Sequence, residues 1–175
     1  MSSGMVILLQ GPRGSGKTLT MTEVSLEFLN NGWKIYRNFD LSFGEYIDDK
    51  FILELDKDST LRDCVILIDE MQIFFDSRLW KQGSSISFSH FIQQLRKRNI
   101  VLIGTTQYVD TIEKRIRQHV DLLIQPFYNE DTKVCSYRVV DLTSLEGQGD
   151  DVLFYECFYY SPPLFDLYNT NEIVG

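Results

Sequence analysis

The chain of 175 residues has few of the features that membrane, metal-binding and disulfide-rich proteins need. Its three cysteines (Cys64, Cys135 and Cys157) are far apart and form no C-x-x-C pair, which favours reduced thiols over disulfides or a zinc site. No apolar run approaches the roughly 18 residues of a membrane span, and the amino terminus carries no signal pattern. A cytoplasmic chain is therefore expected.

An excess of basic residues is also lacking, because 17 Lys and Arg face 25 Asp and Glu, for a net charge of −8. The average field repels phosphate, so a nucleic-acid partner requires a local basic patch. The composition is otherwise that of a globular protein, with 43% hydrophobic and 24% charged residues. We expect one domain over 1–175, with a core over about 5–126, a β extension over 127–160 and an irregular tail over 161–175.

The most specific motif present is a glycine-rich loop behind the apolar run 5–9. It fits G-x-x-x-x-G-K-[ST] and consists of Gly11, Pro12, Arg13, Gly14, Ser15, Gly16, Lys17 and Thr18. Glycines let successive backbone N–H groups point at phosphate oxygens, and the following helix adds the positive end of its dipole. Lys17 is expected to reach the β- and γ-phosphates, and the Thr18 hydroxyl to bind Mg²⁺. The motif predicts binding of ATP with Mg²⁺.

The rest of the chain alternates apolar runs with helical patterns, which predicts an α/β fold with a mostly parallel sheet. Strands are expected at 33–36, 64–68, 100–103 and 122–124, helices at 17–31, 88–98 and 111–120, a loop at 77–87, and antiparallel strands at 133–141 and 151–160. The acidic stretch 40–58 is expected to be a solvated face. The aromatic-rich stretch 151–160 is expected to be buried strand core, with a partner surface as the alternative.

Two acids, Asp69 and Glu70, end the wholly apolar run 64–68. An aspartate at the carboxyl end of such a strand suits a Walker B residue that holds Mg²⁺ beside Thr18. Glu70 can polarise a water for attack on the γ-phosphate, which favours an energy-transducing ATPase over a simple kinase. The alternative is an acidic strand end that faces solvent.

Thr106 and Gln107 end the neighbouring apolar strand in the same way. Gln107 is a candidate sensor of the γ-phosphate or of the attacking water, and the alternative is a strand-end cap. An arginine finger from a neighbouring subunit is also expected, with Arg115 and Arg117 as candidates, followed by Arg98 and Arg78. For each arginine, a surface salt bridge or a DNA-phosphate contact is an equal alternative.

Several motifs together resemble the ATPase domain of zonula occludens toxin-like and viral genome-packaging proteins in the FtsK/HerA superfamily. They are the phosphate loop, Arg37-Asn38, Ile-Asp-Glu-Met-Gln72, Phe74-Phe-Asp-Ser-Arg78, Gln94-Leu-Arg-Lys-Arg98, Gly-Thr-Thr-Gln107 and Phe165-Asp-Leu-Tyr-Asn-Thr-Asn-Glu172. The resemblance implies a RecA-like core and an oligomeric ring, hexameric or pentameric, that moves double-stranded viral DNA. It also implies a capsid or membrane-vertex partner, in the host cytoplasm or on the virion.

Six of the 17 basic residues fall within a 22-residue window, which offers the local patch that a DNA partner requires. The candidate DNA contacts are Lys81, Arg96, Lys97, Arg98 and Lys114, together with the two arginines of 115–117. We expect DNA translocation into a capsid. Assembly or extrusion of filamentous virions is the alternative, although the toxin-like members' membrane segment has no counterpart here. A nucleotide-dependent switch is a third possibility, which Glu70 argues against.

Overall fold

The structure of the chain is a computed structural model that describes residues 4–55, 57, 60–75, 84–112, 114–143 and 154–168. Of residues 84–90, Arg115 and Phe154 it describes only the backbone. Several predicted features lie outside these residues: Arg78, Lys81, residues 77–83 of the predicted loop, residues 151–153 of the predicted strand and the tail from residue 169 onward.

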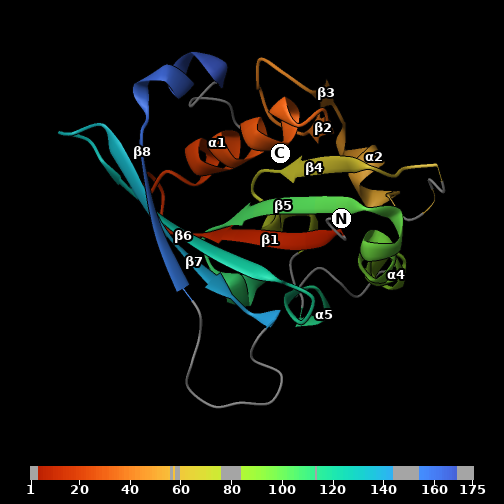
Figure 1. Ribbon diagram of the computed structural model, residues 1–175. Coiled ribbons are helices and arrows are strands. Elements are labelled where there is room, and N and C mark those ends of the chain that lie inside the picture. The colour runs from red at the N-terminus through yellow and green to blue at the C-terminus, as the bar shows by residue number, and fades with distance from the viewer. Residues whose placement is uncertain are drawn as a thin grey trace.

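Eight strands and seven helical segments follow one another along the described chain (Figure 1). Their order is β1 (Met5–Gln10), α1 (Lys17–Asn30), β2 (Lys34–Arg37), β3 (Glu45–Tyr46), α2 (Asp49–Leu53), β4 (Cys64–Ile68), α3 (Gln72–Phe75), α4 (Ser84–Arg98), β5 (Ile100–Thr106), the 3₁₀ turn η2 (Val109–Thr111), α5 (Lys114–Arg117), β6 (Leu122–Asn129), β7 (Val134–Asp141), β8 (Phe154–Tyr160) and the 3₁₀ turn η4 (Pro162–Leu167).

The strands form one mixed sheet in the order β3-β2-β4-β5-β1-β6-β7-β8. The first six are parallel, and β7 and β8 are antiparallel additions beside β6. Strand β5 lies between β1, which leads into the glycine-rich loop, and β4, which leads into Asp69. The predicted α/β class is confirmed: the sheet is mostly parallel and carries a C-terminal antiparallel extension.

The central strands are apolar up to their carboxyl ends because both faces of the sheet are covered (Figure 1). Along β4, Ile66 and Ile68 pack in the cluster that contains α4, whereas Val65 and Leu67 pack in the cluster that contains α1. The same alternation holds along β1 and β5, so each strand contributes to two hydrophobic layers.

The acidic stretch 40–58 contains more structure than the solvated face that its charge predicts. Its described acidic side chains are exposed or half-buried, but Leu41, Ile47 and Ile52 between them are buried. The stretch forms β3 and α2, and the Asp48 side chain caps α2 by accepting a hydrogen bond from the Phe51 N–H at 2.8 Å. Short elements of this kind are fixed by a local cap and by the burial of a few side chains, and they leave no long periodic pattern.

Three predicted boundaries are wrong. Helix α4 begins at Ser84, inside the predicted loop 77–87, and the predicted helix 111–120 shrinks to the four residues of α5. Ile112 has an extended backbone at the end of η2, and after α5 the chain returns to the sheet, where the Asp121 N–H donates to the Val6 carbonyl at 2.9 Å. The tail is not wholly irregular, since Pro162 opens η4, as suits its fixed φ.

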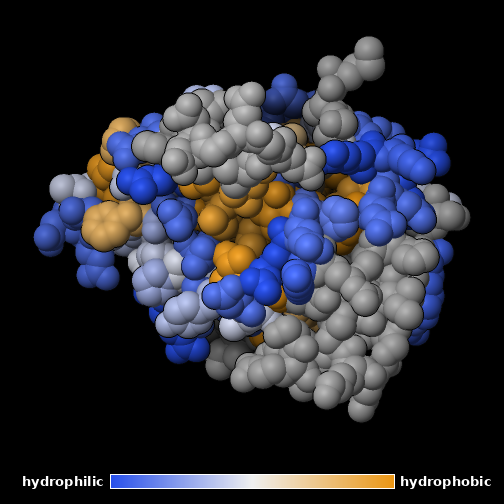
Figure 2. Space-filling view, turned by 90° about the horizontal axis from the view of Figure 1, so that it is seen from below, coloured by the Kyte–Doolittle hydropathy of each residue, from blue (hydrophilic) through white to orange (hydrophobic). Residues whose placement is uncertain are grey.

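The prediction that residues 151–160 form buried core is also wrong. Phe158 is 69% exposed and Tyr160 64%, while Tyr159 between them is half-buried and bonds Thr20. Phe127 and Phe158 both lie opposite Ser136 and, with it, border a hollow of about 240 Å³. Strand β8 is at the edge of the sheet, and only its alternate residues face α1. Hydrophobic side chains also reach the surface at the centre of the face seen in Figure 2, beside hydrophilic ones.

Candidate nucleotide-binding site

The glycine-rich loop connects β1 to α1 in a conformation that its glycines make possible. Gly14 has φ 76° and Gly16 has φ 91°, both in the left-handed region that favours glycine. At Gly11, a side-chain Cβ would lie 2.5 Å from Ser15 Oγ. A side chain would strain the backbone at Gly14 and Gly16 and collide with Ser15 at Gly11, so the three glycines permit the tight turn before α1.

Lys17 lies at the base of this loop and is only 7% exposed. Its ammonium donates hydrogen bonds to the carbonyls of Gly11 at 2.9 Å and Pro12 at 3.0 Å. Burial lowers the pKa of Lys17, although the carboxylates of Glu70 and Asp69 act in the opposite direction. The lysine is therefore a buried cation placed beside the backbone that would surround a phosphate.

Ser15 leaves one polar group of the loop unsatisfied. Its hydroxyl oxygen is buried and has no hydrogen-bond partner among the described residues. A buried polar group without a partner is costly, and a phosphate oxygen would satisfy it. The glycine conformations, the buried Lys17 and the free Ser15 hydroxyl all fit a polyphosphate.

Thr18 and Asp69 meet across the site. Thr18 Oγ1 donates to the Asp69 carboxylate at 3.2 Å, and Thr105 Oγ1 donates to the same carboxylate at 2.5 Å. Burial raises the pKa of Asp69, and the two hydroxyls act against this rise. A hydroxyl and a carboxylate are the hard oxygen ligands that Mg²⁺ prefers, so this pair fits the ion. Thr18 and Asp69 would hold it, and it would supply charge neutralisation at the phosphates.

Glu70 follows Asp69 in a left-handed conformation with φ 51°. Its backbone N–H donates to Thr105 Oγ1 at 2.9 Å, and the Met71 N–H donates to the Thr105 carbonyl at 2.8 Å. The Gln72 side-chain amide donates to the Glu70 carboxylate. The carboxylate therefore projects from a turn that is docked on the end of β5.

Gln107 lies beside the glycine-rich loop, as its position after β5 predicts. Thr106 pairs with Gln10, and the Gly11 N–H donates to the Thr106 carbonyl at 3.3 Å. The half-buried Gln107 follows directly, whereas the Thr106 hydroxyl serves its own turn by donating to the Tyr108 carbonyl at 3.2 Å. The structure thus brings the loop, Asp69, Glu70 and Gln107 to one edge of the sheet.

Two residues at this edge have no role in the sequence-based prediction. Asn38, which is 3% exposed, bonds the backbone of Asp69 from the end of β2, and Thr105 bonds both Asp69 and Glu70. Thr105 comes directly after Gly104, at the end of an apolar run. Gln107 is recognised by the same feature, so the sequence offers a comparable signal for Thr105. Asn38 is part of the Arg37-Asn38 pair but gives no signal of its bond to Asp69.

The basic candidates lie away from the glycine-rich loop. The basic end of α4 lies at the edge of the sheet where β4 begins, because the Asp63 N–H just before β4 donates to the Arg98 carbonyl at 3.0 Å. The glycine-rich loop lies at the opposite edge, where β1 ends. Arg96 pairs with Asp121 at 2.5 Å, and Arg117 pairs with Asp110 at 2.6 Å. Helices α4 and α5 lie near one another in Figure 1. Within one chain, both arginines pair with acidic side chains outside the glycine-rich loop and the Asp69 turn, while the side chain of Arg115 lies outside the described residues.

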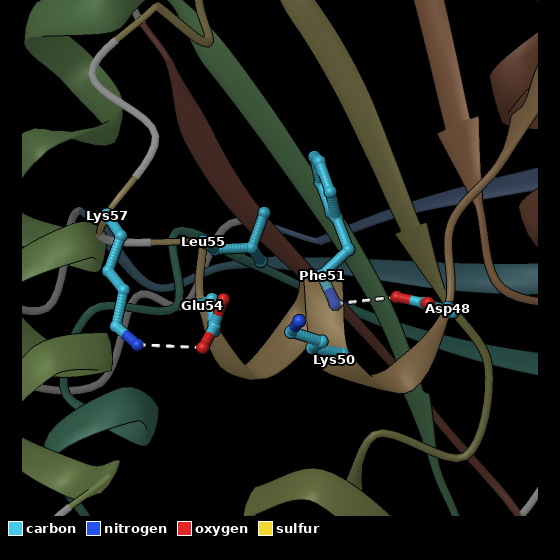
Figure 3. Close-up of a pocket in the computed structure, with 6 residues that line it drawn as sticks. All are labelled: Asp48, Lys50, Phe51, Glu54, Leu55 and Lys57. Atoms are coloured by element: carbon cyan, nitrogen blue, oxygen red, sulfur yellow. Dashed lines mark hydrogen bonds and ion pairs between the residues drawn. The ribbon is translucent and has the colours of Figure 1, made fainter.

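A separate hollow of about 400 Å³ lies beside α2 (Figure 3). Its described lining is Asp48, Lys50, Phe51, Glu54, Leu55 and Lys57. Phe51 stacks on Tyr36 with a centroid distance of 6.0 Å, and Lys57 bonds Glu54 at 2.8 Å. None of these lining residues belongs to the glycine-rich loop or to the Asp69 turn, so this hollow is distinct from the nucleotide site.

The fold resembles several solved structures. The N-terminal domain of zonular occludens toxin from Neisseria meningitidis aligns with a TM-score of 0.70 and 18% identity, over 96% of this chain and 100% of that one. The genome packaging NTPase B204 from Sulfolobus turreted icosahedral virus 2 aligns with a TM-score of 0.64 and 17% identity, over 89% and 97%. The flagellar accessory protein FlaH from Methanocaldococcus jannaschii aligns with a TM-score of 0.57 and 14% identity, over 89% and 86%. Such identities show a shared fold.

No curated protein matches the chain in sequence. No helix in the described part of the chain combines the length and the apolar character that crossing a membrane requires. The model of the family named "ATPase family associated with various cellular activities (AAA)" matches residues 7–126, which is more than half of the chain. The matched span includes the glycine-rich loop, Asp69, Glu70 and Gln107, and we conclude that the chain belongs to the AAA family of P-loop ATPases and is an ATP hydrolase.

Proposed function

We propose that this ATPase is an oligomeric motor that translocates viral double-stranded DNA into a capsid. One observation carries the DNA part of the proposal: the basic ends of α4 and α5 lie near one another and away from the glycine-rich loop. A motor needs this division, because the same chain must bind nucleotide at one place and the DNA backbone at another. The fold shared with a genome packaging NTPase supports it.

The geometry of the site supports the following assignment of hydrolytic roles. Lys17 binds the β- and γ-phosphates, and Thr18 with Asp69 would hold Mg²⁺, which would neutralise charge at the phosphates. Glu70 acts as the base that orients and activates the attacking water, and Gln107 senses the γ-phosphate from beside the loop. A neighbouring subunit supplies the arginine finger, with Arg115 and Arg117 as candidates, since Arg117 binds Asp110 rather than the nucleotide site of its own chain.

The basic residues differ in how free they are to grip DNA. Arg96 forms an ion pair with Asp121. The Asp121 carboxylate is largely buried and also accepts a hydrogen bond from the Val6 N–H at 2.8 Å. Lys97 and Lys114 are exposed. These two lysines are the sharper test of DNA binding, because replacing Arg96 also removes a partner from a buried carboxylate.

The first test is ATP turnover of the purified chain with and without linear double-stranded DNA, over a series of protein concentrations. Stimulation by DNA and a more than linear rise with protein concentration are expected of a ring with shared sites. Lys97→Ala with Lys114→Ala should weaken the stimulation and its salt dependence, while Lys50→Ala on the acidic α2 should not. Stimulation that survives the double variant unchanged would contradict the DNA role of α4 and α5.

Assembly or extrusion of filamentous virions is the second candidate, and the likeness to the zonular occludens toxin domain over nearly the whole chain favours it. Both candidates place the ATPase in the host cytoplasm with a capsid or membrane-vertex partner. The two candidates differ in whether DNA should stimulate ATP turnover. An extrusion ATPase that acts on a coat or membrane protein does not need stimulation by linear double-stranded DNA. A nucleotide-dependent switch binds ATP and scarcely hydrolyses it, so a Glu70→Gln variant that retains ATP no longer than the wild type would instead indicate a switch.

A further inference from the structure

One peptide unit at the active site is held by side chains at both of its polar ends. The carbonyl of Asp69 accepts a hydrogen bond from Asn38 Nδ2 at 3.2 Å, and the N–H of Glu70, in the same peptide, donates to Thr105 Oγ1 at 2.9 Å. Asn38 comes from the end of β2, and Thr105 comes from β5. These strands flank β4 in the sheet, so the Asp69–Glu70 peptide lies between two partners.

Each partner makes a second bond to the same turn. Asn38 Oδ1 accepts from the Asp69 N–H at 2.7 Å, so its amide occupies both polar groups of the Asp69 backbone. The Thr105 hydroxyl donates to the Asp69 carboxylate at 2.5 Å while it accepts from the Glu70 N–H. A threonine hydroxyl has one proton to donate, and here that proton is directed at Asp69.

These side-chain hydrogen bonds lie directly beyond the last backbone pairs of β4 in the sheet. Backbone pairing of β4 ends at Leu67 on the β2 side and at Ile68 on the β5 side. Glu70 then adopts φ 51°, a left-handed conformation that a non-glycine residue keeps only when its surroundings hold it. Gly104 contributes by leaving space, since a Cβ there would lie 2.4 Å from Met71 Sδ.

We propose that Asn38 and Thr105 form a peptide clamp that positions Glu70 for hydrolysis. The clamp touches neither phosphate nor water. It fixes the rotation of the Asp69–Glu70 peptide, and this rotation sets the direction in which the Glu70 carboxylate leaves the sheet. The inference rests on the proposed role of Glu70 as the base and assigns to Asn38 and Thr105 a positioning role that neither the family model nor the motifs provide.

A positioning role predicts a specific kinetic pattern. Displacing a catalytic group by about an ångström costs on the order of 100-fold in rate. Thr105→Val replaces the buried hydroxyl with a methyl of similar size, so the nucleotide pocket keeps its shape. We expect kcat to fall about 10- to 100-fold, while the KM for ATP and the binding of an ATP analogue change less than about threefold. Thr105→Ser restores the hydroxyl and should recover most of the rate.

The neighbouring threonine is a matched control. Thr106 is equally buried on the same strand, but its hydroxyl bonds the Tyr108 carbonyl rather than the Asp69 turn. Thr106→Val should therefore leave kcat within about threefold of the wild type. Asn38→Asp keeps the acceptor for the Asp69 N–H but loses the donor to its carbonyl, and it should lower kcat with little change in KM.

The decisive experiment places Thr105→Val in a Glu70→Gln background. If Thr105 acts through Glu70, the double variant turns over ATP at the rate of Glu70→Gln alone, because the loss has already occurred. A further loss in the double variant, or Thr105→Val at the wild-type rate, overturns the clamp. If Glu70→Gln itself hydrolyses ATP like the wild type, the proposed base role fails and the clamp with it, and this outcome differs from a failure of the clamp alone. If Thr105→Val does not fold, Asn38→Asp in the same background gives the same test.

Discussion

The Thr18 hydroxyl, in the first turn of α1, lies 3.2 Å from the Asp69 carboxylate at the end of β4, although 51 residues separate the two positions. Strand β5 lies between β1 and β4, so the contact spans the width of one strand. It joins the phosphate-binding loop to the acidic turn and pairs two oxygen ligands of the kind that Mg²⁺ prefers.

Replacing Thr18 tests this site directly. Thr18→Val removes the hydroxyl with little change in volume, so we expect the Mg²⁺ concentration for half-maximal turnover to rise about 10-fold or more. Thr22→Val is a matched control on the same helix, because the Thr22 hydroxyl bonds only the Thr18 carbonyl at 2.9 Å among the described contacts. An Mg²⁺ titration of both variants is the measurement, and equal requirements would contradict the role of Thr18.

Lys17 should separate activity from stability. Lys17→Met is expected to lower ATP turnover by about 100-fold or more, because the charge that binds the phosphates is lost. Thermal stability without nucleotide should be kept or increased. Since burial lowers the pKa of Lys17, its charged form is less stable in the folded chain than in the unfolded chain. Thermal melting without ATP tests this, and a large drop in the melting temperature would be inconsistent with it.

Glu23 on α1 predicts a pH-dependent difference in stability. Burial raises its pKa, Glu27 adds to the rise, and the Tyr137 hydroxyl, which donates at 3.4 Å, opposes it. A raised pKa means that ionisation costs folding stability. This cost is absent below the ordinary pKa of 4.5 and complete above the raised one.

Glu23→Gln should therefore melt at a higher temperature than the wild type at pH 7. The gain in the free energy of unfolding should be less than about 1 kcal/mol, because the site is half-exposed. The difference should shrink towards pH 4. Glu130→Gln, in the exposed turn after β6, is the control and should change little at either pH. A difference that stays constant from pH 4 to pH 7 would point to a cause other than titration.

Two neighbouring residues of β8 should differ in how much their substitution lowers the stability of the fold. Phe158→Ser, on the exposed face, is expected to change the free energy of unfolding by less than about 0.5 kcal/mol. Tyr159→Phe removes the hydroxyl that lies 3.1 Å from Thr20 Oγ1 and should cost about 1 kcal/mol. Denaturant unfolding of both variants is the measurement. The reverse order would mean that the exposed face of β8 carries stability.

The local pattern of the sequence determined the nucleotide-binding loop, the acidic pair and the parallel strands. The spacing of glycines and Lys17 is set by the backbone that must surround a phosphate, and a strand buried on both faces must be apolar, so both features can be read without coordinates. For the same reason Thr18 and Asp69 were predicted to meet, since both follow parallel strands at one edge of the sheet.

The tertiary structure alone decided which side chains hold those groups and which strands remain uncovered. The bond of Asn38 to Asp69 depends on β2 lying beside β4, and neither residue carries a pattern that reveals it. Phe158 is exposed because β8 is an edge strand whose alternate residues face away from α1, although its aromatic composition predicts core. Local propensity and periodicity set each element, whereas long-range pairing sets which faces and which peptide groups meet, and this pairing is the part that a single sequence does not encode in a readable pattern.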